Sequence, residues 1–261
     1  MAEPVHFLLH IPKCAGTTVE AHFARHLGTA FRLAPRWDSV SRNFIGNRYP
    51  GVEMQGIRAV SGHSLSVSLK QTVDAPVRES VLLRDPLGYF LSFYNYRWAR
   101  HAAGDTKPPD FAPWYLSQRR NPISRFLLNR YFEQGVPALY RFSSAGRLAW
   151  LEDRLRQFHF VGSYRYADEM VAGISRELGI PDTVTHENVT PVKKLRAQDL
   201  DPALQARIIE ENAVDQVLYT RWADRRWQGE PDMPKPNLPR ADHLRYALGD
   251  SIGGIAKKLL R

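Results

Sequence analysis

Residues 5–27 read VHFLLHIPKCAGTTVEAHFARHL, and this stretch decides the fold. Its first part, residues 5–10, is a short apolar run with the length of a buried strand. Residues 12–16 break the run because they contain Pro and Gly, and residues 17–27 follow as a predicted helix. Apolar residues recur at every fourth position of that helix: Val19, Phe23 and Leu27. The chain therefore begins with a strand, a loop and a helix.

The same alternation continues along the chain. Further strands are predicted at residues 57–61, 77–83 and 160–163. Pro86 suits the first turn of a helix that follows the second of these. One face of that helix carries apolar side chains: Leu87, Phe90, Leu91, Tyr94 and Trp98. Strands that alternate with helices predict an α/β protein with a mainly parallel sheet and helices on both faces.

The second half of the chain is predicted to be mostly helical. Four helices are expected there: residues 123–132, 145–158, 168–178 and 201–227. Asp168 and Asp201 are the expected N-caps of the last two. Four prolines between residues 231 and 239 then make a stiff linker before a basic helix over about 240–260. We therefore expect one domain over residues 1–228, followed by a Pro-rich linker and a basic C-terminal helix over 229–261.

The composition is that of a globular protein with an anionic partner. The chain has 36 Lys and Arg against 27 Asp and Glu, a net charge of +9. This excess of positive charge suggests an anionic partner, which is nucleic acid, a membrane surface, or a phosphorylated or sulfated small molecule. A single cysteine excludes an intramolecular disulfide framework and favours a reducing compartment. No apolar run has the length of a transmembrane helix and no signal peptide is recognised, so we expect a cytoplasmic protein.

Polar clusters follow three of the predicted strands. They occupy residues 12–18, 62–64 and 84–86. Ligands of parallel sheets bind at the carboxyl ends of the strands, so these clusters are the candidate site.

The first cluster has the chemistry of an anion cradle. A loop that leads into a helix offers free backbone N–H groups and the positive end of the helix dipole. Gly16 allows the backbone to approach an oxyanion, Lys13 adds charge, and Thr17 and Thr18 add hydroxyl donors. Because the lysine precedes the glycine, this is not the nucleotide-binding Walker pattern. The alternative is that Thr17 caps the helix and Lys13 is simply solvated.

The second cluster combines Arg84, at a strand end, with Ser92 in the helix that follows. The planar guanidinium suits bidentate binding of a phosphate, and both groups can reach one anion. The alternative is that Arg84 pairs with Asp85 and Ser92 merely packs.

Together the two clusters resemble the donor-binding signatures of sulfotransferases that use 3′-phosphoadenosine 5′-phosphosulfate (PAPS). Residues 12–18, PKCAGTT, are similar to the 5′-phosphosulfate loop P-K-[ST]-x-[GS]-T-[ST]. Residues 84–94 carry Arg-Asp-Pro and then Ser-x-Tyr, which resembles the 3′-phosphate motif. Gly62-His63, and the lack of Trp after Thr18, resemble the carbohydrate branch, which includes heparan 2-O-sulfotransferases and bacterial relatives. The resemblance extends, with gaps, over about residues 5–222.

This resemblance implies a P-loop-like three-layer fold and transfer of a sulfuryl group from PAPS to a hydroxyl of a saccharide or glycoconjugate. It implies two catalytic residues: Lys13 stabilises the leaving phosphate, and His63 is the base. The implied donor-binding residues are Lys13, Cys14, Ala15, Gly16, Thr17, Thr18, Arg84, Ser92, Lys193 and Lys194. No metal is implied. The alternative for His63 is a surface or capping histidine.

Two positions depart from the family pattern. Cys14 stands where many relatives carry Thr or Ser, and Tyr89 stands where relatives often have Arg. Because Cys14 lies inside the phosphosulfate loop, we expect its oxidation or alkylation to block donor binding.

Other interpretations remain open. A P-loop nucleotide kinase, a basic protein that binds nucleotides or nucleic acid without catalysis, and a silent product-binding relative are the alternatives. No nucleic-acid motif is recognised, and we expect no nucleic acid as partner.

Arginine and aromatic residues in 89–131 predict an acceptor cleft, with a helix core and a solvated basic face as the alternative. They are Arg97, Trp98, Arg100, Trp114, Arg119, Arg120 and Arg125. The basic helix at the C-terminus predicts peripheral membrane contact or docking on the body of the protein.

Overall fold

The computed structural model describes residues 2–35, 38–39, 47–49, 51–135, 142–184, 194–224 and 227. Its centre is a five-stranded sheet in the order β2-β5-β1-β6-β7. The strands are β1 (Val5–Leu9), β2 (Phe31–Leu33), β5 (Ala59–Gly62), β6 (Val77–Leu83) and β7 (Phe160–Ser163). Every pairing in this sheet is parallel. A separate antiparallel pair joins β3 (Asp38–Ser39) and β4 (Asn47–Arg48).

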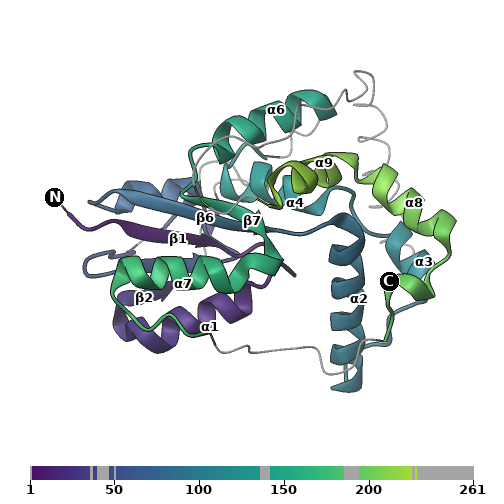
Figure 1. Cartoon of the computed structure of the whole chain (residues 1–261), viewed down its shortest axis with the longest axis horizontal. Coiled ribbons are helices and arrows are strands. Elements are labelled where there is room, and N and C mark those ends of the chain that lie inside the picture. The colour runs from purple at the N-terminus through teal and green to yellow at the C-terminus, as the bar shows by residue number, and fades with distance from the viewer. Residues whose placement is uncertain are drawn as a thin grey trace.

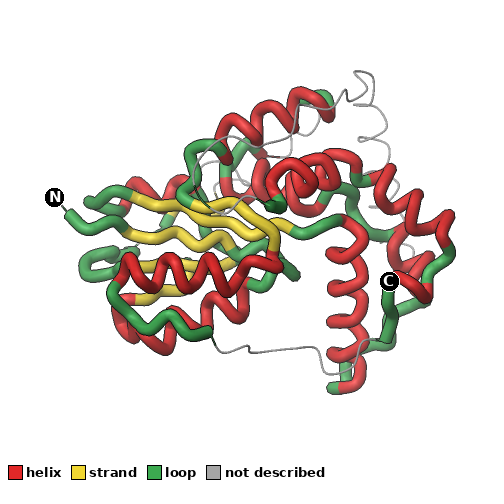
Figure 2. The backbone as a smooth tube through the Cα atoms, viewed as in Figure 1, coloured by secondary structure: helices red, strands yellow, loops and turns green. Residues whose placement is uncertain are grey.

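Helices enclose the sheet and form three layers with it, as Figure 2 shows. They are α1 (Gly16–Leu27), α2 (Pro86–Ala102), α3 (Phe111–Leu116), α4 (Pro122–Arg125), α6 (Ser144–Leu155), α7 (Ala167–Leu178), α8 (Pro202–Glu211) and α9 (Ala213–Trp222). Helices α1 and α7 cover one face, and α4, α6 and α9 lie on the other (Figure 1). Helix α2 runs across the strands beyond their carboxyl ends (Figure 1). The fold is thus α/β with a parallel sheet flanked by helices, as the sequence predicts.

Short turns of other helical types connect these elements. They are the 3₁₀ segments Gly28–Ala30, Val67–Thr72, Tyr164–Tyr166 and Ala197–Asp199, and the π-helical segment Phe126–Tyr131. The predicted helix over 123–132 is therefore α4 followed by the π-helical segment.

The central position of β1 explains why it is buried along its whole length. All five residues of β1 are buried, because β5 and β6 pair with it on both sides and helices cover both faces. The predicted strands at 77–83 and 160–163 are confirmed with the same bounds, and 57–61 is observed as Ala59–Gly62. One apolar core extends from Val5 to Trp222.

Asn212 divides the last predicted helix. Residues 201–227 were expected to form one helix, whereas the structure has α8 and α9, which meet at Asn212. The Asn212 side chain accepts a hydrogen bond from the Asn121 backbone N–H at 2.7 Å and donates to Ile208 O at 2.7 Å. A buried amide that bonds to backbone groups competes with helical hydrogen bonding, and the helix ends there.

Of the two expected helix caps, one is confirmed and one is wrong. Asp201 caps α8 by accepting a hydrogen bond from Ala203 N at 2.9 Å. Helix α7 instead begins at Ala167, its N-cap position is Tyr166, and no side chain caps it. Asp168 lies within the first turn, where a carboxylate interacts favourably with the helix dipole.

The predicted linker and basic C-terminal helix lie outside the described residues, as does the predicted domain boundary at 228. Within the part of the chain that is described, no helix is both long and apolar enough to cross a membrane.

Candidate functional site

The three predicted clusters meet at the carboxyl edge of the sheet. Strands β5, β1 and β6 are neighbours and run in the same direction, so their carboxyl ends lie at one edge. Two hydrogen bonds join the loops that follow them. His63 Nδ1 donates to His10 O at 2.7 Å, and Arg84 Nη1 donates to Lys13 O at 2.8 Å. The loops at the ends of three strands therefore form one site.

The loop after β1 adopts an uncommon backbone conformation. Lys13 and Ala15 have φ angles of 67° and 65°, in the left-handed region that non-glycine residues rarely occupy. Such conformations cost free energy and persist only where the surroundings enforce them, often at functional sites. The Cys14 N–H donates to Ile11 O at 3.2 Å within this turn. The turn carries the chain from the end of β1 directly into α1.

The N-terminus of α1 has no side-chain cap. Its N-cap position is Ala15, and no acidic residue lies in its first turn. Thr17 is exposed within the helix, so the alternative in which it caps α1 is wrong. The first N–H groups of a helix have no carbonyl acceptor within it. At α1, the positive end of the dipole is therefore open to an anion.

Gly16 has a packing role that the sequence did not indicate. A Cβ atom at this position would lie 2.0 Å from Cδ2 of the His10 ring, a distance that real contacts do not reach. Any larger residue would therefore displace His10. The predicted approach of the Gly16 backbone to an oxyanion remains a prediction.

Arg84 is held at the site by two contacts. Besides its bond to Lys13 O, its guanidinium lies 4.1 Å from the centroid of the Tyr164 ring. Its Nε atom is buried and has no hydrogen-bond partner. Asp85 does not pair with it, contrary to the alternative, because the Asp85 carboxylate caps α2 and accepts from Gly88 N at 2.6 Å. A buried donor without a partner indicates a missing acceptor at this position.

Lys13 completes a pair of cations. Its Nζ lies 4.2 Å from the centroid of the Tyr96 ring on α2. Burial, and next the neighbouring Arg84, lower the pKa of Lys13. No carboxylate among the described residues forms an ion pair with Lys13 or Arg84. Two adjacent, partly buried cations without a counterion favour the binding of an anion.

Ser92 lies on α2 one helical turn before Tyr96, so both side chains share a face of the helix. This face is the one that Lys13 contacts. Tyr94, the last residue of the second motif, is buried, and its hydroxyl donates to Pro109 O at 3.0 Å. Its role in the structure is therefore to hold the loop before α3.

The predicted lysine pair is described only in part, because Lys193 lies outside the described residues. Lys194 is exposed, and its Nζ lies 5.1 Å from the centroid of the Trp98 ring. The next residue is fixed to α2 by two hydrogen bonds: Leu195 N donates to Asn95 Oδ1 at 2.9 Å, and Asn95 Nδ2 donates to Leu195 O at 2.8 Å. The lysine segment therefore approaches the same helix that carries Ser92.

His63 reaches solvent on one side and is partly desolvated on the other, where a hydrogen bond fixes its orientation. A carbonyl only accepts, so the bond to His10 O places the proton of a neutral His63 ring on Nδ1 and leaves a lone pair on Nε2. Burial is the main cause that lowers the pKa of His63. The charge of His10 and, more weakly, that of Arg130 also lower this pKa, whereas Glu20 raises it. A neutral imidazole with a free Nε2 has the properties of a general base.

A carboxylate beneath the two histidines was not found from the sequence. Glu20 Oε1 lies 2.7 Å from His10 Nδ1 and accepts from Ser61 Oγ at 3.0 Å. The His10 ring in turn lies 4.0 Å, centroid to centroid, from the ring of His63. The four-residue spacing from Gly16 to Glu20 could have indicated this contact, because it places both residues on one face of α1, the face that His10 contacts.

Three residues of the predicted acceptor cleft have contacts that the sequence did not show, and the cleft itself remains a prediction. Arg100 pairs with Asp105 at 2.8 Å, Arg120 pairs with Glu211 at 2.7 Å, and Trp114 is buried. Arg130, which the sequence analysis did not select, instead lies close enough to His63 to affect its pKa. It belongs to the π-helical segment, a conformation that local periodicity does not signal.

Cys14 does not have the reactivity that its place in the loop suggested. Its side chain is 2% exposed, and burial raises the pKa of the thiol to about 12. The thiolate is the reactive form, so in the native protein oxidation and alkylation at Cys14 are disfavoured. Any contact of Cys14 with a ligand would be through its backbone.

We expect Cys14 in the native protein to react with a chromogenic disulfide reagent about a thousandfold more slowly than in the denatured protein at slightly alkaline pH. The reason is the small thiolate fraction of a thiol whose pKa is about 12. Stopped-flow absorbance with and without denaturant measures both rates. Equal rates would show that the thiol is accessible and ionised in the native state.

Comparison with known proteins neither supports nor opposes the resemblance seen in the motifs. No protein-family model matches the chain, and no curated protein matches its sequence. The functional argument therefore depends on the motifs and the geometry.

Proposed function

We propose that this protein is a sulfotransferase that moves a sulfuryl group from PAPS to an acceptor hydroxyl of a saccharide or glycoconjugate, on a P-loop-like fold. The hydrogen bond from Arg84 to Lys13 O carries the proposal, because it joins the two predicted anion-binding clusters into one site. The proposed setting is the cytoplasm, where a thiol such as Cys14 stays reduced.

The residues present fit a donor with two anionic ends. The Lys13 loop and the uncapped N-terminus of α1 suit the 5′-phosphosulfate. Arg84 has an unused Nε donor for the 3′-phosphate, and Ser92 adds a hydroxyl. Lys194, next to the residue that is hydrogen-bonded to α2, would add positive charge, and Lys193 is proposed to act with it. The donor supplies the activated sulfuryl group, and the protein supplies positive charge at both ends.

Sulfuryl transfer demands alignment and charge stabilisation more than covalent chemistry. The acceptor oxygen forms a bond to sulfur, and the bond from sulfur to the bridging phosphate oxygen breaks. Nε2 of His63 takes the proton of the acceptor hydroxyl. Lys13 and the N–H groups of α1 neutralise the charge that develops on the leaving phosphate. His10, paired with Glu20, holds the base through its backbone carbonyl.

Thermal denaturation with adenosine 3′,5′-bisphosphate tests the proposed site. A ligand at about 100 times its dissociation constant stabilises the native state by about 2.7 kcal/mol. For a chain of this length, that predicts an increase in melting temperature of roughly 5–10 °C. The Arg84→Ala variant should lose this increase, whereas Arg176→Ala, which changes an exposed arginine, should keep it.

The same titration with ATP and with duplex DNA separates the alternatives. An increase with ATP but not with the bisphosphate would contradict the proposal and favour a nucleotide kinase. An increase with DNA alone would indicate a nucleic-acid-binding protein. Stabilisation by the bisphosphate without turnover of labelled PAPS on any glycan would identify a silent product-binding relative.

A further inference from the structure

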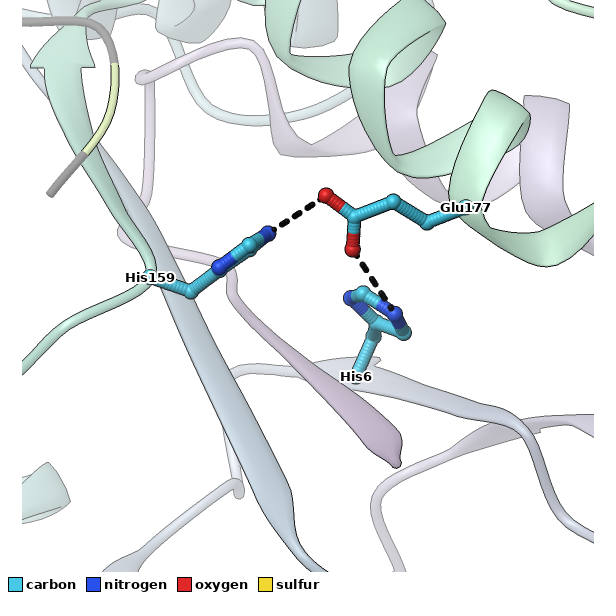
Figure 3. A group of neighbouring side chains, drawn as sticks. All are labelled: His6, His159 and Glu177. Atoms are coloured by element: carbon cyan, nitrogen blue, oxygen red, sulfur yellow. Dashed lines mark hydrogen bonds and ion pairs between the residues drawn. The ribbon is translucent and has the colours of Figure 1, made fainter. Parts of the chain in front are cut away.

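A second polar cluster lies at the opposite edge of the sheet. His6 is the second residue of β1, His159 directly precedes β7, and Glu177 is near the C-terminal end of α7. Both β1 and β7 pair in parallel with β6, which lies between them, with His6 opposite Arg78 and Phe160 opposite Ser80. His6 and His159 therefore lie toward the amino edge of the sheet, away from the Lys13 loop. Figure 3 shows the two imidazoles facing the Glu177 carboxylate, each directed at a different oxygen atom.

The side chains approach one another closely. His159 Nε2 lies 2.8 Å from Glu177 Oε1, and His6 Nε2 lies 3.6 Å from Glu177 Oε2 (Figure 3). One ligand atom from each residue lies within 4.8 Å of the other two. Among the described residues, no other group of three such side chains meets this condition.

His6 lacks a hydrogen bond that accounts for its burial. It is 1% exposed, and its Nδ1 has no partner. Its Nε2 is 3.6 Å from the nearest carboxylate oxygen, which is beyond hydrogen-bond distance. His6 Nε2 faces Glu177 without a hydrogen bond, so this atom is available to a ligand, water or ion, whereas the unpartnered Nδ1 is a separate free-energy cost of burial.

We propose that His6, His159 and Glu177 bind a divalent transition-metal ion, with Zn²⁺ as the preferred ion. Two imidazole nitrogens and one carboxylate oxygen form a ligand set that suits Zn²⁺ and not Mg²⁺ or Ca²⁺. Ligands about 2.0–2.1 Å from a tetrahedral ion lie roughly 3.3 Å apart. His159 Nε2 is 2.8 Å from Glu177 Oε1, and one ligand atom of each of the three residues lies within 4.8 Å of the other two. Binding would therefore require a small opening between Glu177 and His159 and an adjustment of the His6 side chain.

The charges around the cluster allow this arrangement. Arg78 Nη1 holds Glu177 Oε2 at 2.6 Å, which leaves Oε1 for the ion and orients the carboxylate from outside.

The ion would add a bond from His6 to the contact that already joins His159 and Glu177. It would tie the start of β1 to the start of β7 and to the end of α7. The other neighbour of His159 is Trp227, whose ring centroid lies 5.1 Å from that of His159. Because the site lies at the amino edge, the ion stabilises the fold and takes no part in sulfuryl transfer.

Metal binding is measured on the full chain after treatment with EDTA. Titration with Zn²⁺ against a chromophoric chelator should show one ion bound per chain and a rise in melting temperature that EDTA reverses. His159→Ala and His6→Leu should each weaken binding by at least about tenfold, because each removes one of three ligands. His101→Ala changes a histidine outside the cluster, on α2, and should bind as the unmodified protein does.

Two results would overturn the proposal. One is the absence of a bound ion in the unmodified protein at micromolar Zn²⁺. The other is unchanged stoichiometry and affinity in His159→Ala, which would place the ion elsewhere. His159 is only partly buried, so this variant decides the matter even if His6→Leu fails to fold.

Discussion

Replacement of Lys13 by alanine is expected to lower the turnover number for sulfuryl transfer by roughly 10²–10³-fold. The Lys13 ammonium is half-buried, and it has no ion-pair partner among the described residues. In the proposed reaction, its charge would therefore be available where negative charge develops on the leaving phosphate. An interaction that strengthens in the transition state affects turnover more than substrate binding.

The stability of the Lys13→Ala variant separates function from folding. Partial burial of the lysine costs desolvation free energy and lowers its pKa, and the positive charge of Arg84 repels it. Its removal should leave the melting temperature of the free protein unchanged or slightly higher. Loss of activity together with unchanged stability would then identify a functional charge.

Lys107→Ala is the matched control. Lys107 is exposed and its Nζ also lies over an aromatic ring of α2, 5.8 Å from the centroid of Trp98. This variant should transfer sulfuryl groups at the normal rate. An unchanged rate in Lys13→Ala, measured with labelled PAPS under saturating conditions, would remove Lys13 from the mechanism.

Replacement of His63 by alanine is expected to lower turnover by roughly 10²–10⁴-fold, the range for loss of a general base. The affinity for adenosine 3′,5′-bisphosphate should be nearly unchanged, because His63 contacts the His10 carbonyl and not the predicted anion cradle. Calorimetry and initial rates measure the two quantities separately.

His63→Asn is the sharper variant. The asparagine amide can still donate to His10 O, but it has no lone pair in place of Nε2. We expect it to be as inactive as His63→Ala. Recovery of activity in His63→Asn would show that the histidine only orders the loop, and full activity in His63→Ala would exclude any role in catalysis.

The pH profile follows from the direction of the His63 pKa. Burial lowers this pKa below its usual value of 6.5. The base acts when unprotonated, so kcat/KM should be constant near neutral pH and fall as the pH drops through a value below 6.5. The residual activity of His63→Asn should not show this decrease at low pH. A decrease of kcat/KM centred well above pH 6.5 would assign the titration to another group.

Local sequence patterns were sufficient to predict much of the fold. The apolar C-terminal half of β6, the Pro86 start of α2 and the Asp201 cap of α8 all depend on residues close together in the chain. Periodicity and capping are short-range effects, so one sequence shows them. The break at Asn212 was not predicted because its cause is a hydrogen bond with Asn121, 91 residues away.

The residue types of the site were visible in the sequence, but their partners were not. A lysine before a glycine at a strand end and an arginine at another strand end predicted anion binding. Only the parallel order of β5, β1 and β6 showed that His63 and Arg84 bond to carbonyls of the same loop. Asp85 could have neutralised Arg84, and only the structure showed that it caps α2 instead.

The sequence by itself thus determined the alternation of strands and helices and the chemistry at each strand end. The tertiary structure decided which groups face one another. It buried Cys14 and raised its pKa, placed Glu20 against His10, and brought His6 and His159 to Glu177. The physical reason is that periodicity and capping act over a few residues. Contacts between strand ends instead depend on the order and direction of strands from distant parts of the chain.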